Sequence, residues 1–232
     1  MSTKKLSKNE LTGKNYSIPE HFDDKKAIDE FLDINKDKEI IVVQGLGFVG
    51  AVMSIVCANA LNKEYAVIGI DLPTPESYWK ICSINEGIFP IISADIKVEE
   101  YFQKSIKKKN FYATYDTYAF SKADVVIVDI NLDVKKLDSH INSNDIVDYS
   151  VDISGFKSAI KSIGDSCKED VLVLIETTVP PGYCQKVIQP IIDKAIIKRK
   201  LTSNSILLSH SYERVTPGKN YLNSVINAPR VF

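Results

Sequence analysis

The chain has 232 residues, of which 44% are hydrophobic and 25% are charged, with ten glycines and nine prolines. This composition is typical of a globular protein with one large or two small domains, and it excludes collagen, coiled coil and intrinsic disorder. The 29 basic and 30 acidic residues leave a net charge of −1, so no overall field attracts nucleic acid, and we expect no nucleic-acid partner.

The four cysteines lie far apart without a CxxC pair, and the three histidines show no metal-ligand spacing. We therefore expect reduced thiols, no metal site and a cytoplasmic location. The N-terminal residues are polar and rich in lysine, and they lack the apolar segment of a secretory signal.

Residues 1–38 are predicted to form a polar extension with one helix. Ile28, Phe31 and Leu32 fall on one face of this helix, at the spacing of a helical turn. We expect that face to pack on the domain that follows, which spans residues 39–232.

From Glu39 onward, short apolar runs alternate with helical segments, and this alternation predicts an α/β fold, a doubly wound, mainly parallel sheet with helices on both faces. The apolar runs are nearly continuous, as in strands that are buried on both faces. The predicted strands are Ile40–Gln44, Ala66–Asp71, a short strand near Tyr112, Val125–Asp129, Val171–Glu176 and Ile206–Ser209. The predicted helices are Phe48–Asn62, Glu76–Asn85, Asp95–Lys108, Ile153–Ile163 and Gly182 to about Lys198, the last of them kinked by Pro190.

The segment Ile40–Asn62 has no charged residue and is long enough to cross a bilayer. Gly45, Gly47 and Gly50 interrupt it after a short apolar run. The segment is therefore predicted to be a strand, a tight turn and a helix, and we expect no membrane partner.

The sequence VVQGLGFVGA places Gly45, Gly47 and Gly50 in a GxGxxG pattern directly after a predicted strand. The first glycine permits a sharp turn, the second lets the backbone approach a pyrophosphate, and the third allows close packing of the helix. The first helical residues, Phe48 and Val49, supply free N–H groups to the phosphates. The pattern predicts a Rossmann-like dinucleotide site, although a lone GxGxxG also occurs in ordinary strand-to-helix turns.

Asp71 supports the dinucleotide interpretation, because it ends the second predicted strand 21 residues after Gly50. A carboxylate there accepts hydrogen bonds from the two hydroxyls of an adenosine ribose and repels a 2′-phosphate, which favours NAD over NADP.

Two other enzyme classes share parts of this pattern. Tyr118 and Lys122 form the YxxxK pair of short-chain dehydrogenases, but the TGxxxGxG turn of that class is absent from the sequence. A methyltransferase also binds an adenosyl group on a similar sheet, and Asp71 suits it equally. Competition between NAD and S-adenosylmethionine would separate the two.

Four further segments occur in a characteristic order. They are INEGIFPI (84–91), KADVVIVDI (122–130), ETTVPPGYC (176–184), and SYERVTPGKNYLN (211–223) followed by APRVF (228–232). Together they resemble the UDP-glucose and UDP-N-acetylmannosamine dehydrogenase family of nucleotide-sugar 6-dehydrogenases, over about residues 39–232. ETTVPPGYC carries the most specific part of the resemblance.

The resemblance implies oxidation of the C6 alcohol of a UDP-sugar substrate to a carboxylate, with two NAD reduced and a cysteine that captures the intermediate aldehyde. It implies that Thr178 positions a water at the reacting carbon and contacts NAD, that Glu213 acts with that water, and that Glu213 and Arg214 bind the sugar nucleotide. Ile130, at the end of the fourth strand, is implied to contact NAD. The family also implies a homodimer and a place in polysaccharide biosynthesis.

The sequence departs from the family pattern at several points. The catalytic lysine, asparagine and cysteine of the family and its nucleotide-sugar-binding domain would lie beyond Phe232, so we expect this chain to be inactive alone. Cys184 is predicted to be a buried helical thiol and not the nucleophile. Residues 130–133 replace the family's VPTP, Tyr212 replaces a proline, and the first cation after the second strand is Lys80. The alternative is a non-catalytic NAD-binding module that pairs with a separate chain.

Overall fold

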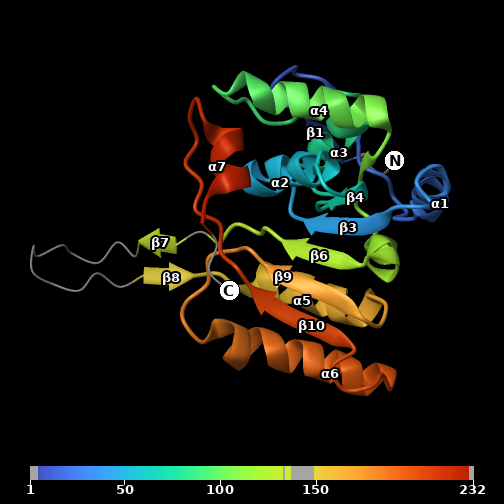
Figure 1. Cartoon of the computed structure of the whole chain (residues 1–232), viewed down its shortest axis with the longest axis vertical. Coiled ribbons are helices and arrows are strands. Elements are labelled where there is room, and N and C mark those ends of the chain that lie inside the picture. Colours follow the sequence, from blue (N-terminus) through green and yellow to red (C-terminus); the bar gives the residue numbers. More distant parts are fainter. Residues whose placement is uncertain (1–4, 133, 137–148, 230–232) are drawn as a thin grey trace, which may run out of the picture.

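The computed structural model describes residues 5–132, 134–136 and 149–229. Its centre is a sheet of six strands: β3 (Glu39–Gln44), β4 (Tyr65–Ile70), β5 (Phe111–Thr114), β6 (Val125–Val128), β9 (Val171–Ile175) and β10 (Ile206–His210). The spatial order is β10-β9-β6-β3-β4-β5, and every neighbouring pair is parallel (Figure 1). The predicted parallel, doubly wound sheet is confirmed.

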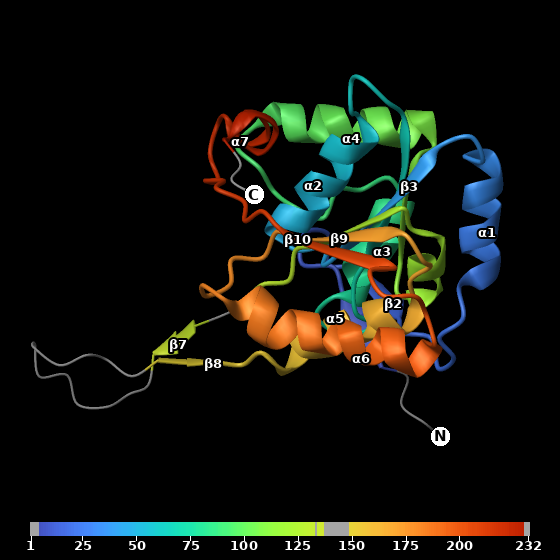
Figure 2. The same cartoon turned by 60° about the horizontal axis from the view of Figure 1, so that its bottom comes forward.

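Helices cover both faces of the sheet. They are α1 (Lys25–Ile34), α2 (Phe48–Ala58), α3 (Tyr78–Asn85), α4 (Ile96–Lys108), α5 (Ser154–Ser166), α6 (Gln189–Arg199) and α7 (Tyr221–Asn227), with a 3₁₀ helix η1 (Thr117–Lys122). Figure 2 shows α2 and α4 on one side of the sheet and α5 and α6 on the other. Within β3, Val42 packs with α1, α5 and α6, while Ile41 and Val43 pack with α2, α3 and α4. Both faces of the strand are buried, which explains its unbroken apolar sequence.

Several helix ends differ from the prediction: α5 continues to Ser166, three residues beyond the predicted end, and α3 begins at Tyr78, two residues after the predicted start. The helix α2 ends at Ala58, because the side-chain amide of Asn59 donates to the carbonyls of Ile55 and Tyr101, both at 2.8 Å. The predicted helix from Gly182 is a π-helical turn, η2 (Cys184–Ile188), followed by α6. Pro190 has no N–H for the helical ladder, and the hydrogen-bond pattern changes just before it.

The segment that resembles a membrane span is a strand, a turn and a helix, β3 and α2, as predicted. In the described part of the chain no helix has the length and apolarity needed to cross a membrane.

The N-terminal extension contains more structure than the predicted helix. Besides α1, it forms an antiparallel hairpin of β1 (Leu6–Lys8) and β2 (Asn15–Ser17). The hairpin docks on α3, where the hydroxyl of Ser7 accepts from the Trp79 N–H at 2.9 Å and the amide of Asn9 donates to the hydroxyl of Ser83 at 2.8 Å. The helix α1 buries Ile28 and Phe31 on the sheet, as its spacing predicts.

A second antiparallel hairpin, which the sequence did not predict, projects from the domain between β6 and α5. It consists of β7 (Val134–Lys136) and β8 (Tyr149–Val151) (Figure 1). Asp133, part of the segment that replaces the family's VPTP, and Arg230–Phe232, the end of the APRVF segment, lie outside the described residues.

Candidate functional site

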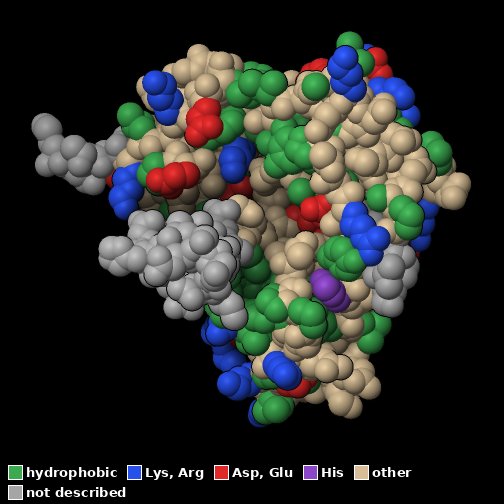
Figure 3. All heavy atoms as spheres, turned by 90° about the vertical axis from the view of Figure 1, so that its left-hand side faces the viewer, with side chains coloured by type: hydrophobic (Ala, Val, Ile, Leu, Met, Phe, Trp, Pro, Cys, Tyr) green, Lys and Arg blue, Asp and Glu red, His purple; other side chains and the backbone are tan. Residues whose placement is uncertain are grey.

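A cavity of about 800 Å³ opens at the carboxyl ends of the strands, where the chain order reverses between β3 and β6. Open α/β sheets bind their ligands at this switch point, and the volume lies in the usual range for a cofactor pocket of roughly 300–1,000 Å³. Figure 3 faces this edge of the sheet and shows the hollowed surface with acidic side chains beside it. Eight of the predicted site residues line the cavity: Gly45, Gly47, Phe48, Val49, Asp71, Ile130, Thr178 and Glu213.

The three glycines of the turn have different surroundings. Gly45 has a φ of +103°, and a Cβ there would lie 2.4 Å from the carbonyl oxygen of Asp129. A Cβ on Gly50 would lie 1.9 Å from the carbonyl oxygen of Gly45. A Cβ on Gly47 would have no protein atom within 4 Å, since it would point into open space at the cavity. Gly45 and Gly50 are therefore required by the fold itself, whereas Gly47 leaves room for a ligand.

The turn leads directly into the N-terminus of α2. Gly47 is the N-cap, and no side chain caps the helix. The N–H groups of the first helical turn have no partner within the helix, and the helix dipole makes this end favourable for an anion. The residues present fit the pyrophosphate of a dinucleotide, with the N–H groups of Phe48 and Val49 as its donors.

Asp71 follows β4 and lines the cavity near the glycine turn. One carboxylate oxygen accepts from the Leu46 N–H at 3.2 Å and lies 3.6 Å from Nζ of Lys80, and the other accepts from the Leu72 N–H at 2.8 Å. The Leu46 bond ties the carboxylate to the glycine turn. Asp71 is thus fixed next to the phosphate position and can accept from ribose hydroxyls.

The opposite end of the cavity lies at the ends of β9 and β10. The hydroxyl of Thr177 accepts from the Ile130 N–H at 2.9 Å, which joins β9 to the segment after β6. Thr178 is exposed at the cavity, and the N–H of Glu213 donates to the Glu176 carbonyl at 3.4 Å. One carboxylate oxygen of Glu213 accepts from the Val215 N–H at 2.7 Å, which fixes its orientation. These contacts bring a hydroxyl and a carboxylate from two strands to one space.

The helix α7 packs on α2 and α4, beside the start of α2. The ring of Tyr221 stacks on Phe48 with 4.6 Å between centroids, and its hydroxyl donates to the Phe48 carbonyl at 2.9 Å. Burial raises the pKa of Tyr221, and the charge of Glu213 adds to this shift. A tyrosine that stays protonated keeps its hydrogen bond to the start of α2.

Two predicted site residues do not line the cavity. Gly50 lies beneath the turn, where it contacts protein backbone and not a ligand. Arg214 is exposed, and its guanidinium lies 4.8 Å from the centre of the Tyr212 ring and donates to its hydroxyl. The tyrosine that replaces the family's proline therefore holds the arginine at the rim.

The other chemically suggestive residues lie elsewhere. Cys184 is in the π-helical turn and is half-buried, not fully buried as predicted, and burial raises the pKa of its thiol. Tyr118 and Lys122 lie on η1, where the hydroxyl of Tyr118 donates to Asp29 of α1 at 3.1 Å. That YxxxK pair belongs to the packing of the extension. Among the described residues, no group of three His, Cys, Asp or Glu side chains is arranged to hold a metal.

None of the cavity residues on α5 was predicted from the sequence. This helix turns a face of small residues to the cavity: Gly155, Ser158, Ala159 and Ser162. Their spacing of three and four residues was a usable signal for one helix face. The other cavity residues that were missed as site residues are Gln44, Ile70, Leu72, Lys80, Tyr115, Thr117, Asp129, Asn131, Leu132, Glu176 and Thr177.

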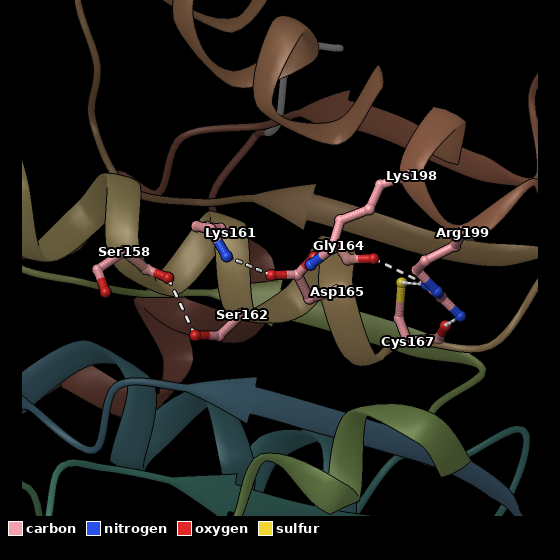
Figure 4. A network of polar contacts seen from close by, with 8 residues as sticks. All are labelled: Ser158, Lys161, Ser162, Gly164, Asp165, Cys167, Lys198 and Arg199. Carbon is pink, nitrogen blue, oxygen red and sulfur yellow. Dashed lines mark hydrogen bonds and ion pairs between the residues drawn. The ribbon is translucent and has the colours of Figure 1, made fainter. Parts of the chain in front are cut away.

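Contacts with α6 hold α5 in this orientation, as Figure 4 shows. Asp165 pairs with Lys161 and with Lys198 of α6, and the hydrogen bond from Lys161 is the main reason that the pKa of Asp165 is lowered. Arg199 donates to the carbonyls of Gly164 at 2.7 Å and Cys167 at 2.6 Å. The helices α5 and α6 thus meet closely at Gly164, where Ala195 and Ile192 pack against it, and the charged pairs lie at the margin of this contact.

Comparison with known proteins gives one family. Residues 39–232 match the NAD binding domain of the UDP-glucose/GDP-mannose dehydrogenase family. The chain is 31% identical over 189 residues to a UDP-N-acetyl-D-mannosamine dehydrogenase of Methanococcus vannielii. The matched region covers 79% of this chain and 36% of that protein. A UDP-N-acetyl-D-mannosamine dehydrogenase of Pyrococcus horikoshii is 23% identical over 188 residues, or 81% of this chain and 39% of that protein.

A solved structure supports the same assignment. The NDP-N-acetyl-D-galactosaminuronic acid dehydrogenase of Methanosarcina mazei superposes with a TM-score of 0.70 at 25% identity, over 88% of this chain and 40% of that one. The chain therefore spans about two-fifths of the length of these relatives. With the glycine turn, the acidic residue after the second strand of the sheet and the switch-point cavity, this match places the chain in the UDP-glucose/GDP-mannose dehydrogenase family, as an NAD-binding domain.

Proposed function

We propose that the chain is the NAD-binding half of a nucleotide-sugar 6-dehydrogenase, which oxidises the C6 alcohol of a UDP-sugar to the uronic acid with two NAD. The observation that carries this proposal is that Thr178 and Glu213 line the same cavity as Gly47 and Asp71. A hydroxyl and a carboxylate therefore share one space with the features that fit a dinucleotide.

In this proposal the adenosine end of NAD lies at Asp71 and its pyrophosphate at Gly47 and the N-terminus of α2. The cofactor supplies the acceptor for hydride from the sugar carbon. Ile130 and Thr178 bind the cofactor at the other end of the cavity, where the bond between Thr177 and the Ile130 N–H fixes the backbone. Gly45 shapes the turn and lines the cavity beside the pyrophosphate, while Gly50 shapes the turn from beneath.

Thr178 and Glu213 act on water in this proposal. A carboxylate whose orientation is fixed by the Val215 N–H can accept a proton from a water molecule, and the neighbouring hydroxyl can position that water. Glu213 and Arg214 bind the sugar nucleotide. Arg214 would have to leave the Tyr212 ring to do so, because it is held at the rim of the cavity.

The nucleophilic cysteine is proposed to come from outside these residues. All four cysteines lie in the described part of the chain, and none of them lines the cavity. The proposal also includes a UDP-sugar substrate, assembly of the whole enzyme as a homodimer, a cytoplasmic location and a role in polysaccharide biosynthesis. These rest on the family resemblance.

The test combines binding with turnover. The chain is titrated with NAD, with and without S-adenosylmethionine as a competitor, and then incubated with NAD and UDP-glucose, UDP-N-acetylmannosamine or UDP-N-acetylglucosamine while NADH absorbance is followed. We expect saturable NAD binding, no displacement by S-adenosylmethionine and no turnover. Oxidation of a UDP-sugar by this chain alone would contradict an external nucleophile, and absence of NAD binding would contradict the whole proposal.

A further inference from the structure

We propose that the N-terminal extension, residues 5–34, completes the adenosine end of the cofactor site, and that Phe22 is a positioning residue that acts on adenine through Tyr115. The inference rests on the NAD site proposed above and extends it to a segment that precedes the family match at residue 39. Three observations carry it: the anchoring of the extension on β5, the aromatic contacts of Tyr115, and the lining of the cavity.

The extension is anchored at the carboxyl end of β5 by Asp24. One carboxylate oxygen of Asp24 accepts from the hydroxyl of Tyr112 at 2.8 Å and from that of Thr114 at 2.5 Å. Its N–H donates to the carboxylate of Asp116 at 2.9 Å. These partners lie on both sides of Tyr115 in the sequence, so the hydrogen bonds of Asp24 fix the short segment that carries Tyr115.

Tyr115 is held from outside the cavity by two aromatic rings. The Phe22 ring meets it edge-on, with 5.7 Å between centroids and 68° between planes, and the Tyr78 ring of α3 lies at 5.9 Å and 49°. Such aromatic pairs are stabilising beyond the area that they bury. Phe22 is 55% exposed, so its ring has little share in the hydrophobic core. Its principal aromatic contact is therefore with a residue that lines the cavity.

The cavity wall near Asp71 has the chemistry of an adenosine site. Tyr115 lines the cavity together with Asp71, Leu72, Lys80 and Thr117. The carboxylate suits the ribose hydroxyls, while Leu72 and the Tyr115 ring offer apolar and aromatic surface to a purine. Base-to-aromatic contacts contribute substantially to nucleotide binding. The geometry gives Tyr115 the adenine contact and Phe22 the role of fixing its ring.

The experiment compares the wild-type chain with Phe22→Ala, Phe22→Tyr and Ile34→Ala by calorimetric titration with NAD and with AMP. Ile34→Ala is the matched control, because Ile34 is also exposed, at 63%, but lies at the far end of α1. We expect Phe22→Ala to weaken NAD and AMP by the same factor, about threefold to tenfold, from the loss of one aromatic pair. Phe22→Tyr keeps the ring and the affinity, and Ile34→Ala leaves both affinities unchanged.

A second measurement separates positioning from unfolding of the extension. Trp79 is the single tryptophan, it is buried, and its backbone N–H donates to Ser7 of the hairpin, so its fluorescence reports whether the hairpin still covers α3. Unchanged fluorescence and melting temperature with weakened AMP binding support the inference. Three results would overturn it. Phe22→Ala could bind NAD and AMP as tightly as the wild type, or it could weaken NAD binding and leave AMP binding unchanged. The third is that binding weakens only together with a change in Trp79 fluorescence, which would show that the hairpin has left α3. If the wild type itself does not bind NAD, the proposed function fails, and the inference fails with it.

Discussion

At the residue scale, Gly47 and Gly50 have separable roles although they belong to one motif. Gly47→Ala meets no protein atom within 4 Å, so we expect an unchanged melting temperature and at least tenfold weaker NAD binding, because the methyl group occupies pyrophosphate space. Gly50→Ala meets the Gly45 carbonyl oxygen at 1.9 Å, and we expect it to lower the free energy of unfolding by at least about 2 kcal/mol. Thermal melts and NAD titrations of both variants test this. Full NAD affinity in Gly47→Ala would show that the phosphates lie elsewhere.

Asp71 determines the choice between NAD and NADP in this account. In Asp71→Asn the shape of the side chain is kept, but its charge no longer repels a 2′-phosphate, and Lys80, 3.6 Å away in the native protein, is released to pair with it. We expect the ratio of NAD to NADP affinity to fall by about tenfold or more, since hydrogen bonds to charged groups are worth roughly 1.5–3 kcal/mol. Calorimetric titration with both dinucleotides measures the ratio. An unchanged ratio of the two affinities would show that Asp71 does not contact the ribose.

At the element scale, the docking of the N-terminal hairpin is predicted to depend on pH. Glu86 directly follows α3. Its carboxylate accepts a hydrogen bond from Nζ of Lys14 at 2.7 Å and another from the hydroxyl of Tyr16 at 2.8 Å. The hydrogen bond from Lys14 is the main cause of the lowered pKa of Glu86, whose ordinary value is 4.5. A lowered pKa in the folded state stabilises the fold above pH 4.5, and this stabilisation is lost as the pH falls through the folded value.

Lys14→Met should therefore lower the melting temperature at pH 7, and lower it by less at pH 3. The pair is exposed, so we expect a shift of about one or two degrees. Lys26→Met is the matched control, because Lys26 lies 3.7 Å from Glu30 on the exposed side of α1 and holds no other element. Thermal melts at the two pH values measure the difference. Equal shifts at both pH values would contradict a role for the Glu86 charge.

The elements that the sequence predicted are those with a strong local signal. Each strand of the central sheet was predicted to within one residue at its ends where bounds were given, because residues buried on both faces leave a continuous apolar run, as in β3. The hairpins β1–β2 and β7–β8 have strands of three residues, which is too short for a periodic pattern to show. The π-helical turn before α6 was missed because Pro190 predicts a disruption without specifying its form.

At the scale of the whole molecule, the site residues were likewise predicted where the sequence has a local signal and missed where it has none. Gly45, Gly47 and Asp71 were found because a parallel sheet brings the ends of β3 and β4 to one edge, which their spacing in the sequence encodes. Tyr115 joins the cavity wall through its long-range contact with Phe22 of the extension, for which no local pattern exists. The small residues of α5 do share one helix face in the sequence, but which element or ligand that face meets depends on long-range packing. The orientation of Arg214 depends on Tyr212, and only the structure shows it.

Viewed as a whole, the molecule has a cofactor cavity built from both halves of one sheet. The segments after β3 and β4 line one end of it with the glycine turn and Asp71, and the segments after β6, β9 and β10 line the other end with Ile130, Thr178 and Glu213. The chain spans about two-fifths of the length of its relatives and corresponds to the NAD-binding domain of the family.

The measurement that tests this account most directly is a calorimetric titration of the 232-residue chain with NAD, repeated with Gly47→Ala as the variant that keeps the fold and fills the phosphate space. The account predicts saturable binding of one NAD per chain, at least tenfold weaker in the variant. A folded wild-type chain, verified by a cooperative thermal melt, that shows no saturable NAD binding would contradict it.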